Sequence, residues 1–174
     1  MVKSSFSRFS SAQFEPNLNP SHEERITFID QIPMLIKTLR NLLADAEPGL
    51  LNTSYRQNGW TVRQIVHHMA DNDMNAYIRF KRALTEESPM GGSYREDLWA
   101  ELSDYKELPV ENSLLLLEVL HNRFWVLLNS LQPEDFRRAL RTQVLGEITL
   151  DIALQRFVWH DLHHMSQIAL VVKK

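Results

Sequence analysis

The chain has 174 residues, enough for one domain with a sizeable core, and its formal net charge at pH 7 is −3. This near balance argues against a nucleic-acid-binding surface and against a polybasic membrane patch. The lack of cysteine excludes disulfides, thiolate metal ligands and a protein thiol nucleophile. No secretory signal and no apolar run long enough to span a bilayer is visible, so we expect a cytoplasmic protein.

The first 20 residues are rich in Ser and Asn and contain two prolines, which predicts an irregular N-terminal arm over residues 1–20. A single domain is expected over residues 21–174. Its first helix begins after Ser21, whose hydroxyl can cap the helix, and continues to about Ala46. We expect Pro33 to kink or interrupt this helix, because proline lacks the backbone N–H group.

A polar connection over residues 52–59 leads to the second predicted helix, which Thr61 can cap. This helix ends at the stretch 88–92, which contains proline and two glycines. The linker that follows, up to Pro109, is long enough that we expect it to cover part of a site. The third predicted helix extends over residues 110–131.

The last part of the chain predicts a short helical turn over residues 133–140 and a strand-like or turn-like piece over residues 142–149. The fourth helix is expected over residues 149–172. Four helices of roughly 20 residues without convincing strands predict an all-α fold, a four-helix bundle.

Histidines are concentrated in two of these helices: His67 and His68 in the second, and His160, His163 and His164 in the fourth. Imidazoles on buried helix faces are costly unless they bind something. A lone histidine is more often a satisfied core or surface residue, but three neutral imidazoles can hold a divalent metal with one position open. The joint pattern therefore favours a reactive metal site.

Helical geometry selects two ligands of such a site. His164 lies within the apolar stripe of the fourth helix and His160 at its edge, one turn away, whereas His163 lies on the opposite flank. Residues i and i+4 can direct two imidazoles at one ion, so we predict His160 and His164 as ligands. The third ligand is His67 or His68, and the periodicity does not choose between them because both flank the apolar stripe.

A polar row accompanies His68 on the second helix and suits a wet pocket. It consists of Asn72, Asn75 and Arg79, with Asp71 beside it. Asp71 could accept a proton from a ligand imidazole and so fix its tautomer. The row is a candidate for orienting ligands or for binding an anionic cofactor, although a salt bridge to another helix is the simpler explanation for Arg79.

Several stretches closely resemble the YfiT family of the DinB-like superfamily, and the resemblance extends over most of the chain from about Phe14. The stretches are Leu51–Arg56, Gly59–Asp71, Met74–Lys81, Ala83–Glu87, Trp159-His160 and His163-His164. The resemblance implies a four-helix bundle that acts as a metal-dependent hydrolase or as a thiol S-transferase using bacillithiol. It implies nickel or zinc held by three histidines, which match His68, His160 and His164, and it implies a homodimer.

These observations predict a metalloenzyme in which a divalent metal activates a thiol cosubstrate or water to attack a small electrophilic substrate. Two other functions remain open. The metal could be purely structural, with Asp71 or Asp161 as a fourth ligand. Alternatively, the bundle could bind a small molecule without metal, in a pocket lined by Trp60, Trp99 and Trp159.

Overall fold

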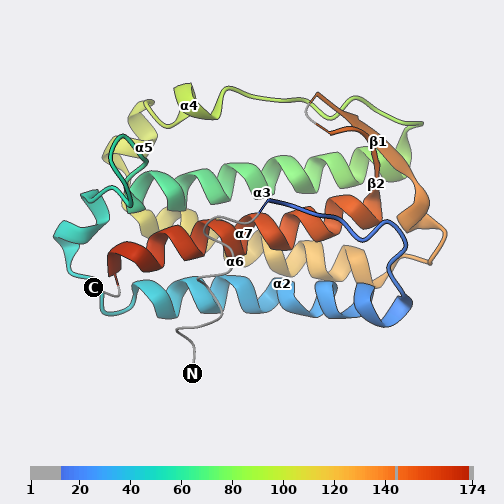
Figure 1. Cartoon of the computed structure of the whole chain (residues 1–174), viewed down its shortest axis with the longest axis horizontal. Coiled ribbons are helices and arrows are strands. Elements are labelled where there is room, and N and C mark those ends of the chain that lie inside the picture. Colours follow the sequence, from blue (N-terminus) through green and yellow to red (C-terminus); the bar gives the residue numbers. More distant parts are fainter. Residues whose placement is uncertain (1–12, 144, 173–174) are drawn as a thin grey trace.

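The computed structural model describes residues 13–143 and 145–172. Four long helices lie side by side: α2 (His22–Leu43), α3 (Val62–Thr85), α6 (Val110–Asn129) and α7 (Leu150–Val172) (Figure 1). Both α2 and α3 pack against α6 and α7, so the order around the bundle is α2, α6, α3, α7. The predicted all-α four-helix bundle is confirmed.

The predicted helix starts are present as capping boxes. The Ser21 hydroxyl accepts the N–H of Glu24 at 3.1 Å, and the Glu24 carboxylate accepts the N–H of Ser21 at 2.8 Å. Thr61 and Gln64 form the same arrangement at the start of α3.

The predicted interruption of the first helix is wrong, because α2 continues through Pro33 and ends at Leu43, three residues before the predicted end at Ala46. Proline removes one intrahelical hydrogen bond. On either side of it, however, Ile32 and Ile36 are buried in the core. This packing helps to keep the helix continuous across Pro33.

The connections contain short elements that the sequence pattern did not resolve. They are η1 (Pro48–Asn52), α4 (Glu96–Trp99), α5 (Ser103–Glu107), η2 (Asp135–Arg137), β1 (Ala139–Thr142) and β2 (Gly146–Thr149). The helical turn expected over residues 133–140 is therefore only three residues long, and Leu140 belongs to a strand. The strands form an antiparallel hairpin in which Leu140 lies opposite Ile148. Both side chains are buried, and an alternation over four residues is too short to be recognised in a sequence.

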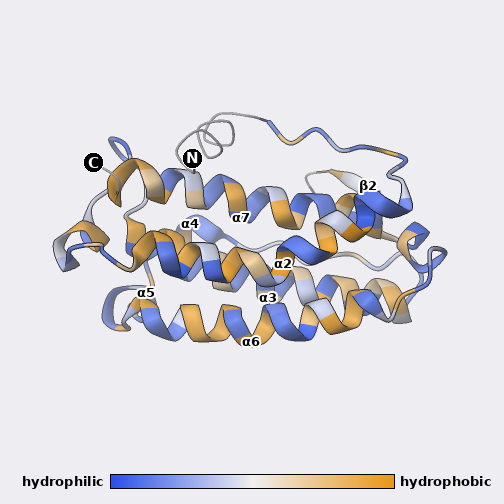
Figure 2. Ribbon diagram, turned by 90° about the horizontal axis from the view of Figure 1, so that it is seen from below, coloured by the Kyte–Doolittle hydropathy of each residue, from blue (hydrophilic) through white to orange (hydrophobic). Residues whose placement is uncertain are grey.

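The core fills the space between the four long helices, and Figure 2 shows hydrophobic and hydrophilic residues alternating along each of them. Its largest fully buried side chains include Phe80, Phe124, Leu39 and Leu154. No helix in the described part of the chain is long and apolar enough to cross a membrane.

The predicted N-terminal arm is described only from residue 13 onward, and its first 12 residues lie outside the described part. Residues 13–20 contain no helix or strand and pass across α7 (Figure 1). Asn17 holds this segment in place, because its backbone N–H donates to the Gln155 side chain at 2.8 Å and its carbonyl accepts from the same side chain at 2.9 Å. Residues 13–20 are thus irregular in conformation but attached to the bundle.

Candidate metal centre

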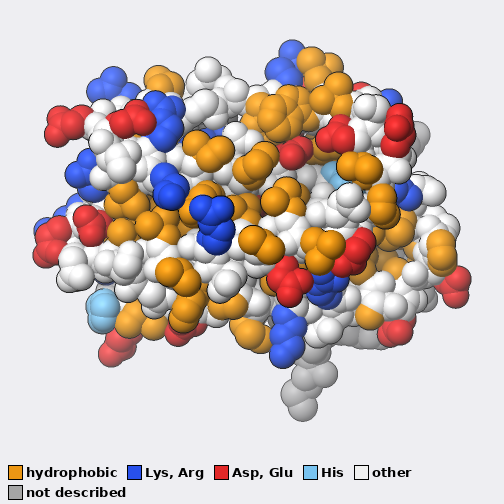
Figure 3. Space-filling view, turned by 180° about the vertical axis from the view of Figure 1, so that it is seen from behind, with side chains coloured by type: hydrophobic (Ala, Val, Ile, Leu, Met, Phe, Trp, Pro, Cys, Tyr) orange, Lys and Arg blue, Asp and Glu red, His pale blue; other side chains and the backbone are white. Residues whose placement is uncertain are grey.

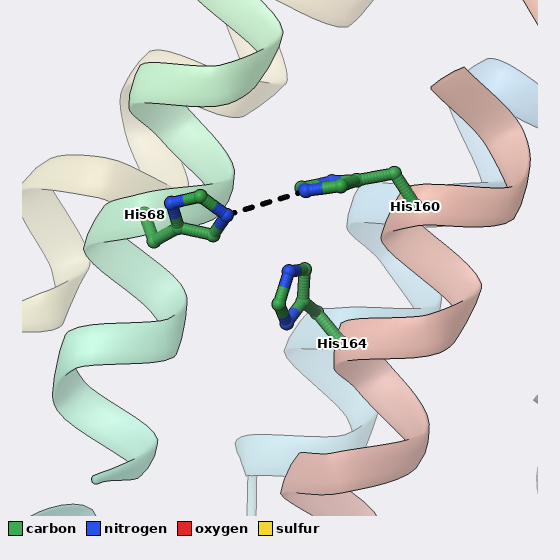
Figure 4. A group of neighbouring side chains, drawn as sticks. All are labelled: His68, His160 and His164. Carbon is green, nitrogen blue, oxygen red and sulfur yellow. Dashed lines mark hydrogen bonds between the residues drawn. The ribbon is translucent and has the colours of Figure 1, made fainter. Parts of the chain in front are cut away.

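Three imidazoles meet where α3 and α7 pack together. His68 points from α3 toward His160 and His164, which lie one turn apart on α7 (Figure 4). One ring nitrogen from each of the three residues lies within 4.8 Å of the others. We refer to these residues as the histidine cluster.

The spacing of the histidine cluster fits a metal ion. The Nε2 atoms of His68 and His160 are 3.2 Å apart. Two nitrogen ligands of a tetrahedral ion, each about 2.0–2.1 Å from the metal, are separated by about 3.3 Å. The trio contains no carboxylate, and three neutral imidazoles leave a divalent ion its full charge and one open position. The residues present therefore fit a divalent metal of the zinc type.

The protonation of the cluster also suits metal binding. Burial lowers the pKa of His68 to about 4. Burial, and then the charge that His68 would carry, lower the pKa of His164 to about 3. The nitrogen lone pairs are consequently free at neutral pH. His160 keeps 12% of its side chain exposed, so the cluster is open to solvent on that side.

Two side chains orient the α7 imidazoles. The Gln167 carbonyl oxygen accepts a hydrogen bond from Nδ1–H of His164 at 2.9 Å, which leaves Nε2 of that ring for an ion. The Asn72 amide lies 3.1 Å from Nδ1 of His160, and an amide can offer its oxygen or its NH₂ group to a ring nitrogen. Sequence reasoning missed Gln167, although its position three residues after His164 places it on the same helix face.

The structure distinguishes the two adjacent histidines of α3. Nδ1 of His67 lies 2.8 Å from the Ser113 hydroxyl on α6, so this ring points away from the cluster. His68 points into the cluster, with the Trp60 ring packed against it at a centroid distance of 4.7 Å. His163 lies outside the cluster and accepts a hydrogen bond from the Gln167 amide at 2.9 Å.

The predicted polar row separates into different roles. The Asp71 carboxylate accepts from the Tyr105 hydroxyl at 2.6 Å, so it holds the linker that lies over α3 and does not contact His68. The Asn75 amide donates to the backbone carbonyl of Asp71 at 2.8 Å. Arg79 donates to the carbonyl of Gly92 and forms no salt bridge with another described residue. Of the four candidates, only Asn72 contacts a histidine of the cluster.

A second group of buried side chains lies behind His160. Asp73 and Asp161 are fully buried, and His121 of α6 reaches between them. Nε2 of His121 forms a hydrogen bond with Asp73 at 2.6 Å and lies 3.7 Å from Asp161. Burial raises the pKa of both carboxyl groups well above the usual range, so the pair retains a proton. We refer to Asp73, His121 and Asp161 as the carboxyl cluster.

The carboxyl cluster bears on the structural-metal hypothesis, which requires a fourth protein ligand. Asp161 faces Asp73 and His121, and Asp71 is held by Tyr105. The group of three imidazoles includes neither proposed carboxylate, although Asp161 and Asp73 form a second group with His160, whose Nδ1 lies 3.9 Å from Asp161. This arrangement favours an open, reactive metal site over a closed structural one.

Comparisons with known proteins agree with this arrangement. The family model described as DinB superfamily matches residues 34–168. A protein of Oceanobacillus iheyensis is 44% identical over 147 residues, covering 84% of this chain and 85% of its own length. A protein of Bacillus cereus is 45% identical over 156 residues, covering 89% of this chain and 90% of its own. Both carry the name "putative metal-dependent hydrolase".

A solved structure shares the whole fold. YfiT from Bacillus subtilis superposes with a TM-score of 0.88 at 38% sequence identity and covers 95% of both chains. It is described as a probable metal-dependent hydrolase with an unusual four-helix bundle topology.

Proposed function

The chain belongs to the DinB superfamily, and on this premise we propose that it is a metal-dependent enzyme whose divalent ion, zinc or nickel, is held by His68, His160 and His164. When bound, the ion lowers the pKa of a water or thiol in its open position, so that the nucleophile is available near neutral pH. The nucleophile attacks a small electrophilic substrate. The reaction is hydrolysis with water and S-transfer with a low-molecular-weight thiol of the bacillithiol type.

One observation carries this proposal: three buried imidazoles from two helices converge without a carboxylate among them. Burying three like groups together is unfavourable unless a ligand pairs with them. A divalent ion supplies that pairing, whereas a proton supplies it poorly because the pKa values of His68 and His164 lie far below neutrality.

Residues around the histidine cluster orient its imidazoles and cover them. Gln167 fixes the orientation of His164, and Asn72 contacts His160. The Trp60 ring covers His68 and keeps water from that side of the cluster. Tyr105, through its hydrogen bond to Asp71, holds the linker against α3.

Elemental analysis tests the metal site, using protein purified without a nickel column. We expect near-stoichiometric zinc or nickel in the wild type and its loss in His164→Ala. His22→Ala is the matched control, because His22 is exposed at the start of α2 and far along the chain from the cluster. A wild-type protein that carries no metal and takes none up on titration would contradict the proposal.

Product analysis then separates the two reactions. With a model electrophile, the metal-loaded protein is incubated with and without an added thiol, and the products are identified by mass spectrometry. A thioether adduct that forms only with the thiol supports S-transfer. A product that has gained the elements of water in both incubations supports hydrolysis.

A homodimer is a further part of the proposal. Several large apolar side chains of α6 are exposed, and Figure 3 shows hydrophobic groups over the face of the molecule on which α6 lies. Among them Leu115 is 53% exposed and Val119 61% exposed. Such a face is typical of a surface that packs against another copy. Light scattering on the wild type and on Val119→Glu tests this, with a dimer expected only for the wild type.

A further inference from the structure

A small cavity opens beside the histidine cluster between α3 and α7. His160 and Asn72 line it on the cluster side, and the hairpin residues Leu140 and Ile148 close its other end. The volume accessible to the centres of water molecules is about 60 Å³. One buried water needs roughly 10–15 Å³ of such volume, so the cavity has room for a small chemical group.

Two arginines line this cavity, Arg79 from α3 and Arg156 from α7. One N–H group of Arg79 donates a hydrogen bond to the carbonyl of Gly92. Arg156 forms no hydrogen bond with another described residue, and its guanidinium lies 5.6 Å from the ring centre of Phe14 and 5.7 Å from that of Trp159. Both arginines are half-buried. Most of their N–H donors are therefore unused at the wall of a cavity.

Neither arginine has a carboxylate within 4 Å in the described part of the chain, in contrast to other arginines of the protein. Arg25 forms a bidentate pair with Asp151, at 2.6 and 2.9 Å. Burial lowers the pKa of Arg79. Arg79 and Arg156 line the same small cavity, which brings two cationic side chains to one wall. Glu96 acts on Arg156 only at longer range, and two cations without a directly bound carboxylate are stabilised when an anion joins them.

We propose that Arg79 and Arg156 form a subsite for an oxyanion, a carboxylate or phosphate group, carried by the substrate or cosubstrate that reacts at the histidine cluster. This inference rests on the proposed function for the reacting end of that molecule. Arg156 lies one helical turn before His160, roughly 6 Å along α7. The ligand class is accordingly a small molecule whose anionic group is separated from its reactive group by a few bonds.

The packing around Arg156 supports a binding role. The arm residue Phe14 and the α7 residue Trp159 enclose its side chain, so the guanidinium is oriented before any ligand arrives. A larger cavity, of about 580 Å³, lies between α2 and α6, but Arg40 in its lining already pairs with Glu111 and Glu118. Lys37, the other cation in that lining, is exposed, whereas the small cavity beside the histidine cluster is lined by two half-buried arginines without a paired carboxylate in the described part of the chain.

Anion binding to the metal-free protein tests the subsite independently of the metal. Calorimetric titrations use inorganic phosphate and propionate as probes, with sodium chloride at matched ionic strength as the blank. We expect saturable binding to the wild type in the millimolar range, and the probe that binds more tightly identifies the anion. Binding should fall at least tenfold in Arg79→Gln and in Arg156→Gln. Arg123→Gln, an exposed arginine on α6, is the matched control and should bind as the wild type does.

A pair of thiols tests the link to the histidine cluster in zinc-loaded protein. The thiol 6-mercaptohexanoate carries an anion several bonds from its sulfur, and 6-mercaptohexanol is its uncharged counterpart. We expect the carboxylate to bind the wild type at least tenfold more tightly than the alcohol. This ratio should fall to about one in Arg156→Gln and should be partly restored in Arg156→Lys, which keeps the charge but lacks the planar fork.

The outcomes separate the two proposals. Absence of saturable binding of either anion to the wild type overturns the subsite, as does equal binding by both arginine variants. If the wild-type protein takes up no metal but still binds anions through its arginines, only the proposal of a metalloenzyme is overturned. Circular dichroism and thermal unfolding of each variant establish that the compared proteins are folded.

Discussion

Two clusters of buried titratable side chains lie next to each other where α3 and α7 pack, and they differ in what their members offer one another. The histidine cluster joins three groups of the same kind, with one ring nitrogen of each within 4.8 Å of the others. The carboxyl cluster joins unlike groups, so that a hydrogen bond of 2.6 Å forms between His121 and Asp73. One cluster has a partially exposed member, His160, whereas all three members of the other are at most 1% exposed.

This difference separates a ligand site from a structural polar core. In the carboxyl cluster a hydrogen bond joins His121 to Asp73, and the burial of its three members ties α3, α6 and α7 together, although both Asp161 oxygens lack a hydrogen-bond partner among the described residues. Like groups that share a centre require a ligand of the opposite kind. We therefore expect changes in the carboxyl cluster to act on folding, and changes in the histidine cluster to act on metal binding.

The largest expected effect is on stability, from breaking the carboxyl cluster. Asp73→Ala leaves His121 and Asp161 buried without their partner, which should lower the free energy of unfolding by about 3–5 kcal/mol. Denaturant unfolding of the metal-free protein measures this change. His68→Ala provides the comparison, because removing one of three like groups should cost less. A smaller loss in Asp73→Ala than in His68→Ala would contradict the distinction between the clusters.

The next effect is on metal affinity. His160→Ala or His164→Ala removes a ligand and should weaken metal binding by more than about 100-fold, the upper end of the cost of losing an outer hydrogen-bond partner. Competition titration with a chromogenic chelator measures the affinity. His163→Ala is the matched control on the same helix, and it should keep most of the affinity because its ring lies outside the cluster. An equal loss in His163→Ala would show that the ligands are assigned to the wrong face of α7.

Much of this comparison could be predicted from the sequence, because it depends on local periodicity. Residues three to four apart share a helix face, which predicted the long helices and placed His160 and His164 together. The choice between His67 and His68 depends on a contact across the bundle, in which Ser113 of α6 lies beside His67. No pattern within α3 contains that information.

The carboxyl cluster could not be predicted for the same reason. Its three members come from three helices, and His121 lies 48 residues from Asp73 and is separated from both carboxyl groups by whole elements. Nothing in the sequence pattern connects His121 with the two carboxyl groups, and Asp161 is predicted there only as a possible fourth ligand of a structural metal. Burial across helices, and not spacing along one, makes them a cluster.

The pH dependence of stability should differ between the clusters. The pKa of His164 in the folded metal-free protein is about 3, below its ordinary value of about 6.5 in an unfolded chain. The unfolded state therefore binds more protons below pH 6.5, and the stability due to neutral His164 is lost as the pH falls from 6.5 toward 3. Between pH 7 and pH 5 this loss should be about 2 kcal/mol.

The contribution of the carboxyl cluster to stability depends on pH in the opposite direction. The raised pKa values of Asp73 and Asp161 give stability that is fully present below their unfolded pKa and lost as the pH rises through the folded values. Denaturant unfolding with a chelator present measures the free energy of unfolding of the wild type and of His164→Gln at each pH. The contribution of Asp73 and Asp161 is common to both proteins and cancels in the difference between the two free energies. A difference that does not change between pH 7 and pH 5 would contradict the burial of a neutral His164.

The smallest expected effect comes from the hydrogen bond that links the histidine cluster to its surroundings. Gln167→Ala leaves all three ligands in place but removes the acceptor for Nδ1–H of His164. Metal affinity should fall about tenfold, the lower end of the range for an outer partner, because the lost acceptor is an uncharged amide. Gln167→Glu keeps an acceptor and should bind metal at least as tightly as the wild type, because a carboxylate makes the imidazole a stronger ligand. Since the two variants differ in the acceptor and not in the ligands, a tenfold loss in both would show that Gln167 acts on the metal through packing and not through this hydrogen bond.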